Sequence, residues 1–369
     1  MKNYLNFETE IKKLEEELDV LKDPYNKDGI SEVNTNEIIS FEEKINSKLE
    51  KIYSNLNPWQ TTQVARHEDR PKAKYFIENL FEDFVSLSGD RFYGEDKSVI
   101  SGFAKFNNRS VLVIGQEKGE NLDERLDRNF GMMRPEGYRK SIRLMELADK
   151  FKIPIITFID TPGAYPGVGA EERGQAEAIA RSIETCMKLT VPNISIIIGE
   201  GGSGGAIALA SASKVIMLEN SIYSVISPEG CATILWRDPK KTLEAAEAMK
   251  LTSKELLDLK IIDEIIKEPI GGAHRDRESI IESVRQSIEK NLSNFENLSN
   301  DEIILQRKNK FLQIGRGGGF SSKPDISSGS ISFQKNTFNA IMEKISKNKK
   351  IFIASAIIAC SIIGYFYLL

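Results

Sequence analysis

The segment from Ile196 to Ala210 constrains the fold of this chain more than any other; it reads IIIGEGGSGGAIALA. An apolar β-branched run leads into glycine at five of the seven positions 199–205, and an alanine-rich segment of helical composition follows. A short apolar run bounded by glycine predicts a buried strand. We therefore predict a tight strand-to-helix connection whose bare backbone can approach another group closely.

The same order of strand, glycine-rich turn and helix recurs from about residue 98. Strands are predicted at 111–115, 153–160, 194–199 and 215–218, and helices at roughly 135–152, 170–189 and 204–212. This alternation predicts an α/β layer structure. Ligands of open α/β folds bind at the carboxyl ends of the strands. The turns DTPGAYPGVG (160–169) and GEGGSGG (199–205) therefore predict a site where they meet.

Three regions are predicted before the C-terminal segment 351–369. Apolar residues recur at spacings of three and four over 7–22 and 36–56, which predicts a helical hairpin within 1–60, packed against the main domain or a partner. Residues 61–315 hold the α/β domain and its C-terminal helices. Residues 316–350 begin with GRGGGFSSKPDISSGS, a composition typical of a flexible linker.

The C-terminal segment 351–369 contains nineteen residues without a charge, IFIASAIIACSIIGYFYLL, and Lys347, Lys349 and Lys350 precede it. As a helix it would be about 28 Å long, close to the ~30 Å hydrocarbon core of a bilayer. Preceding lysines favour the cytosolic side. The segment predicts a tail anchor that holds a cytoplasmic protein at the inner face of the membrane. A buried or self-associating helix is the alternative.

Composition narrows the classes of function. The net charge is only −4, which argues against a nucleic-acid-binding protein with a concentrated basic face. Cys186, Cys231 and Cys360 are far apart in the sequence, so no disulfide framework and no metal site are predicted. His67 and His274 are the two histidines, and any mechanism that uses histidine depends on them.

Two short motifs resemble functional ones but lack their context. Ala206 and Ile207 stand where a P-loop needs Lys and Ser/Thr, so DTPG (160–163) does not indicate a nucleotide hydrolase. EAMK (247–250) resembles a biotin-attachment motif at Lys250, but the surrounding TLEAAEAMK is helical in composition rather than a β-turn.

Two chemical hypotheses remain for the glycine segment. GGSGG matches the G-x-S-x-G nucleophile elbow, with Ser203 as nucleophile, His274 as base and Asp258 or Asp263 as orienting acid. Ser203 could equally serve as a helix N-cap. In the second hypothesis, glycine amides at the helix start donate to a developing oxyanion, which requires no histidine.

Longer motifs point to one family. RNFGMMRPEGYRKSIRLMELADKFKIPIITFIDTPGAYPGVGAEERGQAEAIAR (128–181) resembles the carboxyltransferase alpha subunits of bacterial-type acetyl-coenzyme A carboxylase. The same resemblance is carried by VARHEDRP (64–71), IGEGGSGGAIAL (198–209), YSVISPEGCATILW (223–236) and EPIGGAHRD (268–276). It extends from the N-terminal hairpin to about Gly315 and leaves out the C-terminal tail.

The resemblance implies a crotonase-like fold, a spiral of ββα units. It implies transfer of a carboxyl group from carboxybiotin to acetyl-coenzyme A, giving malonyl-coenzyme A for fatty acid biosynthesis. The implied assembly is α2β2 with a carboxyltransferase beta subunit, which holds the zinc and the enolate oxyanion hole. Biotin is implied on a separate carrier protein, and ATP is used only by the biotin carboxylase component.

The resemblance also implies site residues. The amides of Gly204 and Gly205 would donate to the ureido carbonyl of biotin. Substrate-binding roles are implied for Gly163, Ala164, Tyr165, Pro166, Gly167, Gly201, Gly202, Ser203, Ser227, Pro228, Glu229 and Gly230.

Several of these roles have alternatives. Residues 163–169 could form a structural loop, and Glu229 could orient the glycine segment or form a salt bridge. Arg134, Arg139 and Lys140 could reach coenzyme A phosphates or lie solvated on a helix. We interpret His274 as structural.

Overall fold

The computed structural model describes residues 3–315, except residues 24, 27–28 and 31–34. Their centre is an eight-stranded mixed sheet with the order β10-β8-β7-β6-β5-β4-β3, in which β9 pairs with the end of β7. The strands are β3 (Glu82–Ser86), β4 (Val99–Phe106), β5 (Arg109–Gln116), β6 (Ile155–Thr161), β7 (Asn193–Gly202), β8 (Lys214–Leu218), β9 (Ile222–Ser224) and β10 (Glu264–Ile266). The four strands predicted from the sequence are confirmed as β5 to β8, which run parallel to one another.

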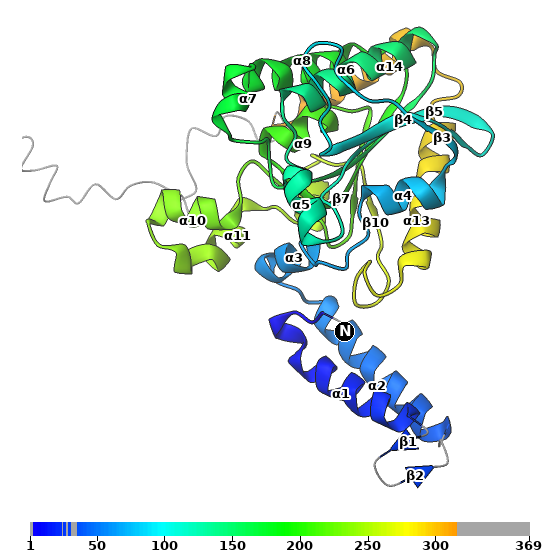
Figure 1. Cartoon of the computed structure of the whole chain (residues 1–369), viewed down its shortest axis with the longest axis vertical. Coiled ribbons are helices and arrows are strands. Elements are labelled where there is room, and N and C mark those ends of the chain that lie inside the picture. Colours follow the sequence, from blue (N-terminus) through cyan, green and yellow to red (C-terminus); the bar gives the residue numbers. More distant parts are fainter. Residues whose placement is uncertain (1–2, 24, 27–28, 31–34, 316–369) are drawn as a thin grey trace, which may run out of the picture. The chain divides into compact units, whose positions relative to one another are not determined.

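Helices cover both faces of this sheet (Figure 1). One layer contains α6 (Pro135–Lys150), α8 (Gln175–Lys188) and α9 (Ser203–Ala210), and the other contains α4 (Ala73–Leu80) and α13 (Arg277–Ser293). Every residue of β6 and β7 is buried, as expected for parallel strands covered on both sides. Further helices are α3 (Pro58–Ala65), α5 (Leu122–Asp127), α7 (Val168–Glu172), α10 (Pro228–Trp236), α11 (Thr242–Met249), α12 (Ser253–Asp258) and α14 (Asn300–Gln313).

The predicted N-terminal hairpin is confirmed as α1 (Thr9–Lys22) and α2 (Thr35–Tyr53). Its apolar contacts come from the residues at helical spacing, Ile11, Leu14, Leu18, Ile45 and Leu49. The predicted turn between the helices contains two short paired strands, β1 (Tyr25–Asn26) and β2 (Gly29–Ile30).

The hairpin packs against the main domain through a buried ion cluster. Arg275 donates from Nη1 to Oε1 of Glu15 at 2.6 Å and from Nη2 to Oε1 of Glu8 at 3.0 Å. Beside it, the rings of His67 and His274 stack with centroids 3.9 Å apart, and Nε2 of His67 lies 3.1 Å from the carbonyl oxygen of Asn3. His274 therefore belongs to the joint between hairpin and domain, which supports its structural interpretation.

This joint is expected to weaken in acid. Burial, together with the positive charges of neighbouring groups, holds the pKa of His274 at about 2. The unfolded chain binds a proton at this side chain below about pH 6.5, whereas the folded chain does not. Stability should therefore fall as pH drops from 6.5 to 5, by up to about 1.4 kcal/mol per pH unit. Urea unfolding at several pH values measures this slope, and His274→Phe should flatten it. An unchanged slope in that variant would contradict this assignment.

The connection after β7 differs from the sequence prediction. We predicted a strand ending near residue 199 and a glycine loop, but β7 continues through Gly202 and α9 begins at Ser203. The reason is pairing: Glu200, Gly201 and Gly202 lie opposite Ile222, Tyr223 and Ser224 of β9. The sharp turn falls on Ser203, whose φ of 52° lies in the left-handed region.

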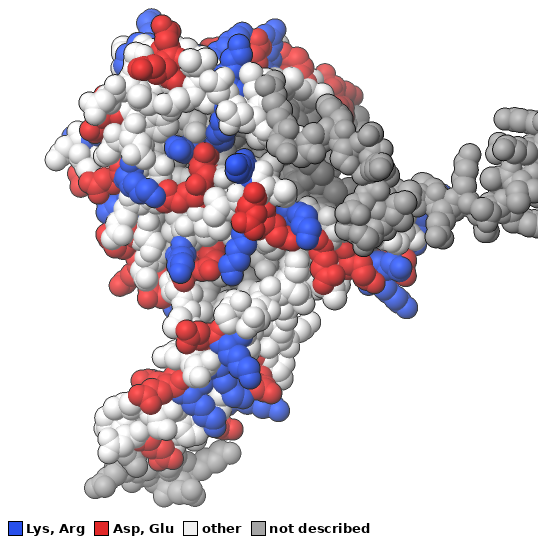
Figure 2. All heavy atoms as spheres, turned by 180° about the vertical axis from the view of Figure 1, so that it is seen from behind, with Lys and Arg blue, Asp and Glu red and all other residues white. Residues whose placement is uncertain are grey.

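Two further observations concern the distribution of charge on the surface and the C-terminal tail. On the face shown in Figure 2, acidic and basic side chains are interspersed. Within the described residues, we find no helix with the length and apolar character needed to cross a bilayer. The predicted linker 316–350 and the predicted membrane segment 351–369 lie outside the described residues.

Candidate functional site

The glycines after β7 allow two backbone segments to touch. A Cβ on Gly205 would lie 2.5 Å from the carbonyl carbon of Gly163, and a Cβ on Gly202 would collide with the carbonyl oxygen of Pro162. A Cβ on Gly204, in contrast, would make only ordinary contact with Ile179 at 3.5 Å. The turns after β6 and β7 therefore meet, as predicted, and Gly202 and Gly205 are required there by packing.

The N-terminus of α9 forms the open part of this junction. Among the described residues no side chain caps the helix end. Ser203 and Gly204 are partly exposed, while Gly205 is buried and its carbonyl accepts a hydrogen bond of 2.8 Å from Nε2 of Gln116. Uncapped amides at a helix start combine free donors with the positive end of the helix dipole. This end can therefore stabilise negative charge on an oxygen.

The segment 163–167 is fixed beside this helix end. The amide of Tyr165 donates to the carbonyl of Met133 at 3.1 Å, and its carbonyl accepts from Nε2 of Gln175 at 3.0 Å. The guanidinium of Arg134 lies 4.7 Å from the centre of the Tyr165 ring. Gly163 contacts the start of α9, and Pro166 is exposed.

The segment 227–230 is held close by β9. Because β9 pairs with Glu200–Gly202, the chain that follows it begins beside the glycines. Ser227 caps α10 by accepting a hydrogen bond from the amide of Gly230 at 3.1 Å, and Pro228 occupies the first turn. Glu229 forms the salt bridge anticipated as one of its two roles, with Arg66 Nη1 2.6 Å from its Oε1.

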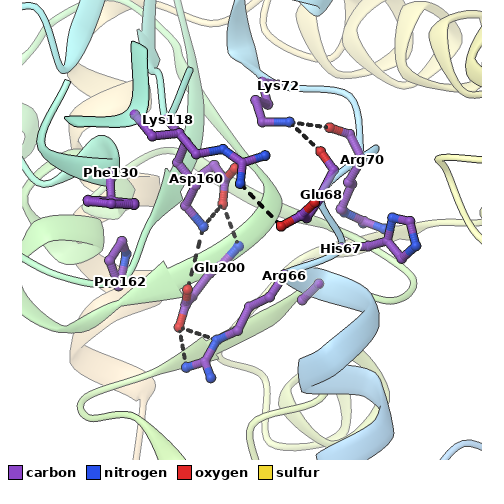
Figure 3. Close-up of a pocket in the computed structure, with 12 residues that line it drawn as sticks. Arg66, His67, Glu68, Arg70, Lys72, Lys118, Phe130, Asp160, Pro162 and Glu200 are labelled. Atoms are coloured by element: carbon purple, nitrogen blue, oxygen red, sulfur yellow. Dashed lines mark hydrogen bonds and ion pairs between the residues drawn. The ribbon is translucent and has the colours of Figure 1, made fainter. Parts of the chain in front are cut away.

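A network of charges behind the glycines was missed in the sequence (Figure 3). Nζ of Lys118 lies 2.7 Å from Oδ1 of Asp160 and 3.4 Å from Oε2 of Glu200. Arg66 donates from Nη2 to Glu200 at 2.6 Å and reaches Glu229 with its other arm. Burial opposes ionisation, but the opposite charges outweigh it, so that the pKa of Glu200 is lowered and that of Lys118 is raised. Lys118 follows a predicted strand, and Arg66 lies in VARHEDRP; neither position alone signals a network.

The serine hydrolase alternative is not supported. Both ring nitrogens of His274 are buried without a hydrogen-bond partner among the described residues, so neither Ser203 nor any aspartate, Asp258 included, is bonded to it. Asp263 instead accepts from Lys310 at 2.5 Å and from the amide of Val215 at 2.7 Å. The G-x-S-x-G match reflects the sharp turn and not a triad.

Ser203 is accordingly expected to be dispensable as a nucleophile. A fluorophosphonate probe, which labels the nucleophilic serine of serine hydrolases, should leave the wild-type chain unlabelled. Because the left-handed φ of 52° disfavours a side chain, Ser203→Gly should keep the free energy of unfolding within about 1 kcal/mol of the wild type or raise it. Labelling that disappears in Ser203→Gly would contradict this expectation.

Lys140, near the start of α6, fits neither of the two roles considered for it. Lys140 is 1 % exposed and donates to Glu95 and to the carbonyls of Asp96 and Val99, so it neither reaches coenzyme A nor lies solvated. Arg139 lies over the ring of Phe92 at 5.3 Å. The segment around EAMK is helical as predicted up to Met249, where α11 ends; Lys250 follows as its C-cap, with a left-handed φ of 54°.

Comparison with solved structures shows the fold. The chain resembles transcarboxylase 12S solved with methylmalonyl-coenzyme A and methylmalonic acid bound, with a TM-score of 0.51 and 18% sequence identity, covering 61% of this chain and 42% of that chain. A second structure, with hydrolysed methylmalonyl-coenzyme A, gives a TM-score of 0.50 at 19% identity, again over 61% of this chain and 42% of that chain. The predicted crotonase-like α/β fold is therefore confirmed.

Comparison of sequences identifies the family. A family model described as "Acetyl co-enzyme A carboxylase carboxyltransferase-like" matches residues 4–315. The acetyl-coenzyme A carboxylase carboxyl transferase subunit alpha of Pelagibacter ubique is 71% identical over 349 residues, 95% of each chain. The same subunit of Gluconacetobacter diazotrophicus is 55% identical over 316 residues, 86% of this chain and 99% of that protein. The chain belongs to the family of acetyl-coenzyme A carboxylase carboxyltransferase alpha subunits.

The first of these alignments is longer than the match to the family model. Only three residues precede residue 4, so the alignment with the Pelagibacter ubique subunit includes part of the segment after residue 315. At least part of the C-terminal extension is therefore shared with a relative.

Proposed function

We propose that this chain, together with a carboxyltransferase beta subunit, transfers the carboxyl group of carboxybiotin on a carrier protein to acetyl-coenzyme A. The product is malonyl-coenzyme A, the substrate for fatty acid synthesis. Membership of the family supports the reaction. The single structural observation that carries the proposal is the uncapped N-terminus of α9, at the carboxyl edge of the parallel strands.

This helix end fits the ureido group of biotin. No side chain among the described residues caps these amides, and Ser203 and Gly204 are partly exposed. The carbonyl oxygen of a bound group can therefore approach them. When bound, carboxybiotin supplies the carboxyl group, and its ring nitrogen accepts a proton from acetyl-coenzyme A. We propose that the amides of Gly204 and Gly205 donate to the ureido oxygen, where negative charge grows. One such donor is worth about 3–4 kcal/mol in the transition state.

The other predicted residues would shape the cleft around these donors. Gly201, Gly202 and Ser203 set the direction of the strand end, and Gly163 supports it from the neighbouring turn. Ala164, Tyr165, Pro166 and Gly167 would form one wall of the cleft, and residues 227–230 the other. The Tyr165 ring is already covered by Arg134, so we assign Tyr165 to positioning of the loop.

Removing one donor without adding atoms tests this assignment. Replacing residue 204 by glycolic acid turns its amide into an ester, which lacks the N–H. We expect carboxyl transfer by the assembled complex to fall about 10²- to 10³-fold. Gly204→Ala is the matched control because it adds a methyl group and keeps the N–H. If the ester transfers carboxyl groups as fast as the wild type, the donor assignment is wrong.

The partners and location are proposed from the family and the sequence. We propose an α2β2 assembly with zinc in the beta subunit, and ATP use confined to the biotin carboxylase component. We place the enzyme in the cytoplasm, held at the membrane by residues 351–369. Fractionation of the full chain and of a chain lacking 351–369 tests the anchor. Both chains in the soluble fraction would refute it.

A further inference from the structure

One continuous series of ion pairs joins all three segments of the proposed site. It begins at Lys118, after β5, and passes to Asp160 and Glu200, at the ends of β6 and β7. Arg66, after α3, continues it from Glu200 to Glu229 in the first turn of α10. The pairs of Lys118 with Asp160 and Glu200 attach the turns 160–167 and 199–205 to one another (Figure 3). The pairs of Arg66 with Glu200 and Glu229 attach the segment 227–230 to them.

Lys118 occupies the junction between the two glycine-bearing turns. Oδ1 of Asp160 forms an ion pair with Nζ of Lys118 at 2.7 Å. The same oxygen accepts a hydrogen bond of 2.9 Å from the amide of Glu200. A Cβ on Gly199 would lie 2.6 Å from the same oxygen. The carboxylate of Asp160 therefore holds the backbone immediately before Gly201, and the ammonium of Lys118 neutralises it there.

The network is sheltered enough for the balance of charge to matter. The side chains of Asp160 and Glu200 are 8% and 7% exposed, and that of Lys118 is 16% exposed. Breaking a buried pair by removing one partner leaves an uncompensated charge and is strongly destabilising. Without Lys118, the carboxylates of Asp160 and Glu200 would face one another with Arg66 as their remaining cation in the series.

We propose that Lys118 is a positioning residue for carboxyl transfer, holding the turn after β6 against the glycines that begin α9. It does not touch the reacting groups; it acts through Asp160 and Glu200. This inference rests on the proposed function for its kinetic consequence. Its structural consequence is independent of that function.

Lys118→Met, which keeps most of the side-chain volume, tests the proposal in the full chain assembled with its beta subunit. A small displacement of catalytic groups costs up to about 10²-fold in rate. We expect kcat for malonyl-coenzyme A formation to fall about 10- to 100-fold, with KM for acetyl-coenzyme A changed less than about threefold. Amide hydrogen exchange over residues 199–207 should accelerate at least about tenfold, while α13 exchanges as in the wild type.

Lys105→Met is the matched control. Lys105 also pairs with an aspartate at 2.7 Å, Oδ2 of Asp83, but its side chain is 50% exposed. Exposed pairs contribute little, so this variant should match the wild type in both measurements. A Lys118→Met variant that behaves like Lys105→Met would overturn the proposal, as would accelerated exchange spread evenly over the chain.

A double-mutant cycle with Asp160→Asn adds a second criterion. If Lys118 acts through Asp160, the double variant should lose no more than about threefold beyond Lys118→Met, because the same contact is already broken. Independent, multiplying losses would overturn the proposed route. Absence of turnover in an intact wild-type complex would instead refute the proposed function, and the exchange measurement would still decide the role of Lys118.

Discussion

Gly205→Ala is expected to reduce carboxyl transfer by the assembled enzyme at least about 100-fold, whereas Gly204→Ala retains most of it. The two residues are neighbours in the first turn of α9, and each change adds one methyl group. At residue 205 the methyl carbon would lie 2.5 Å from the carbonyl carbon of Gly163, so the two turns must separate. At residue 204 its nearest neighbour is Ile179 at 3.5 Å, an ordinary contact distance.

The measurement is the rate of malonyl-coenzyme A formation by each variant in complex with the beta subunit. Size-exclusion chromatography should confirm that both variants assemble. Overpacking of this kind typically costs about 1–3 kcal/mol of stability, and thermal unfolding should show this for Gly205→Ala. Equal activity of the two variants would mean that contact between the turns is not needed for transfer.

Arg70→Met is expected to cost about 3–5 kcal/mol of unfolding free energy, the largest stability effect we predict. The side chains of Arg70 and Glu268 are 4% and 0% exposed and form a two-armed ion pair, with Nη1 3.0 Å from Oε2. Nε of Arg70 also donates to the carbonyl of Ile198 at 2.6 Å, just before the glycines. The variant would leave both the carboxylate and this carbonyl without their partner.

Urea unfolding measures this loss, and a charge-balanced variant separates its causes. In Arg70→Met/Glu268→Gln the residual buried charge is gone, so a substantial part of the stability should return. Asn220 and Ala273 donate their amides to different oxygens of the Glu268 carboxylate. The amide at residue 268 has a single oxygen and can keep one of these two hydrogen bonds, so recovery should be incomplete. A loss below about 1 kcal/mol for Arg70→Met, as for an exposed pair, would contradict the assigned role.

The sequence predicted the parts of the fold that depend on local pattern. The β-branched runs that became β5 to β8 are buried on both faces, so their apolar composition is continuous and easy to recognise. The hairpin helices were predicted from apolar spacing alone. The meeting of the two glycine-rich turns followed from the rule that parallel strands end at one edge.

What the sequence could not predict depends on contacts between distant residues. Arg66 and Glu200 lie 134 positions apart, and either is an ordinary charged residue until the fold brings them together. Both roles considered for Lys140, contact with coenzyme A and solvation on a helix, require an accessible ammonium group, but this group donates to Glu95 and to two backbone carbonyls and is buried. The extension of β7 through Gly202 depended on pairing with β9, which no local pattern revealed.

Transfer of a labelled carboxyl group from carboxylated carrier protein to acetyl-coenzyme A tests the central claim most directly. The wild-type chain, co-expressed with its beta subunit and purified as the intact complex, should form labelled malonyl-coenzyme A, and the beta subunit alone should not. The residue 204 ester in the same complex should slow the transfer about 10²- to 10³-fold. An intact wild-type complex that leaves all of the label on the carrier would contradict the claim that this chain is a working carboxyltransferase subunit.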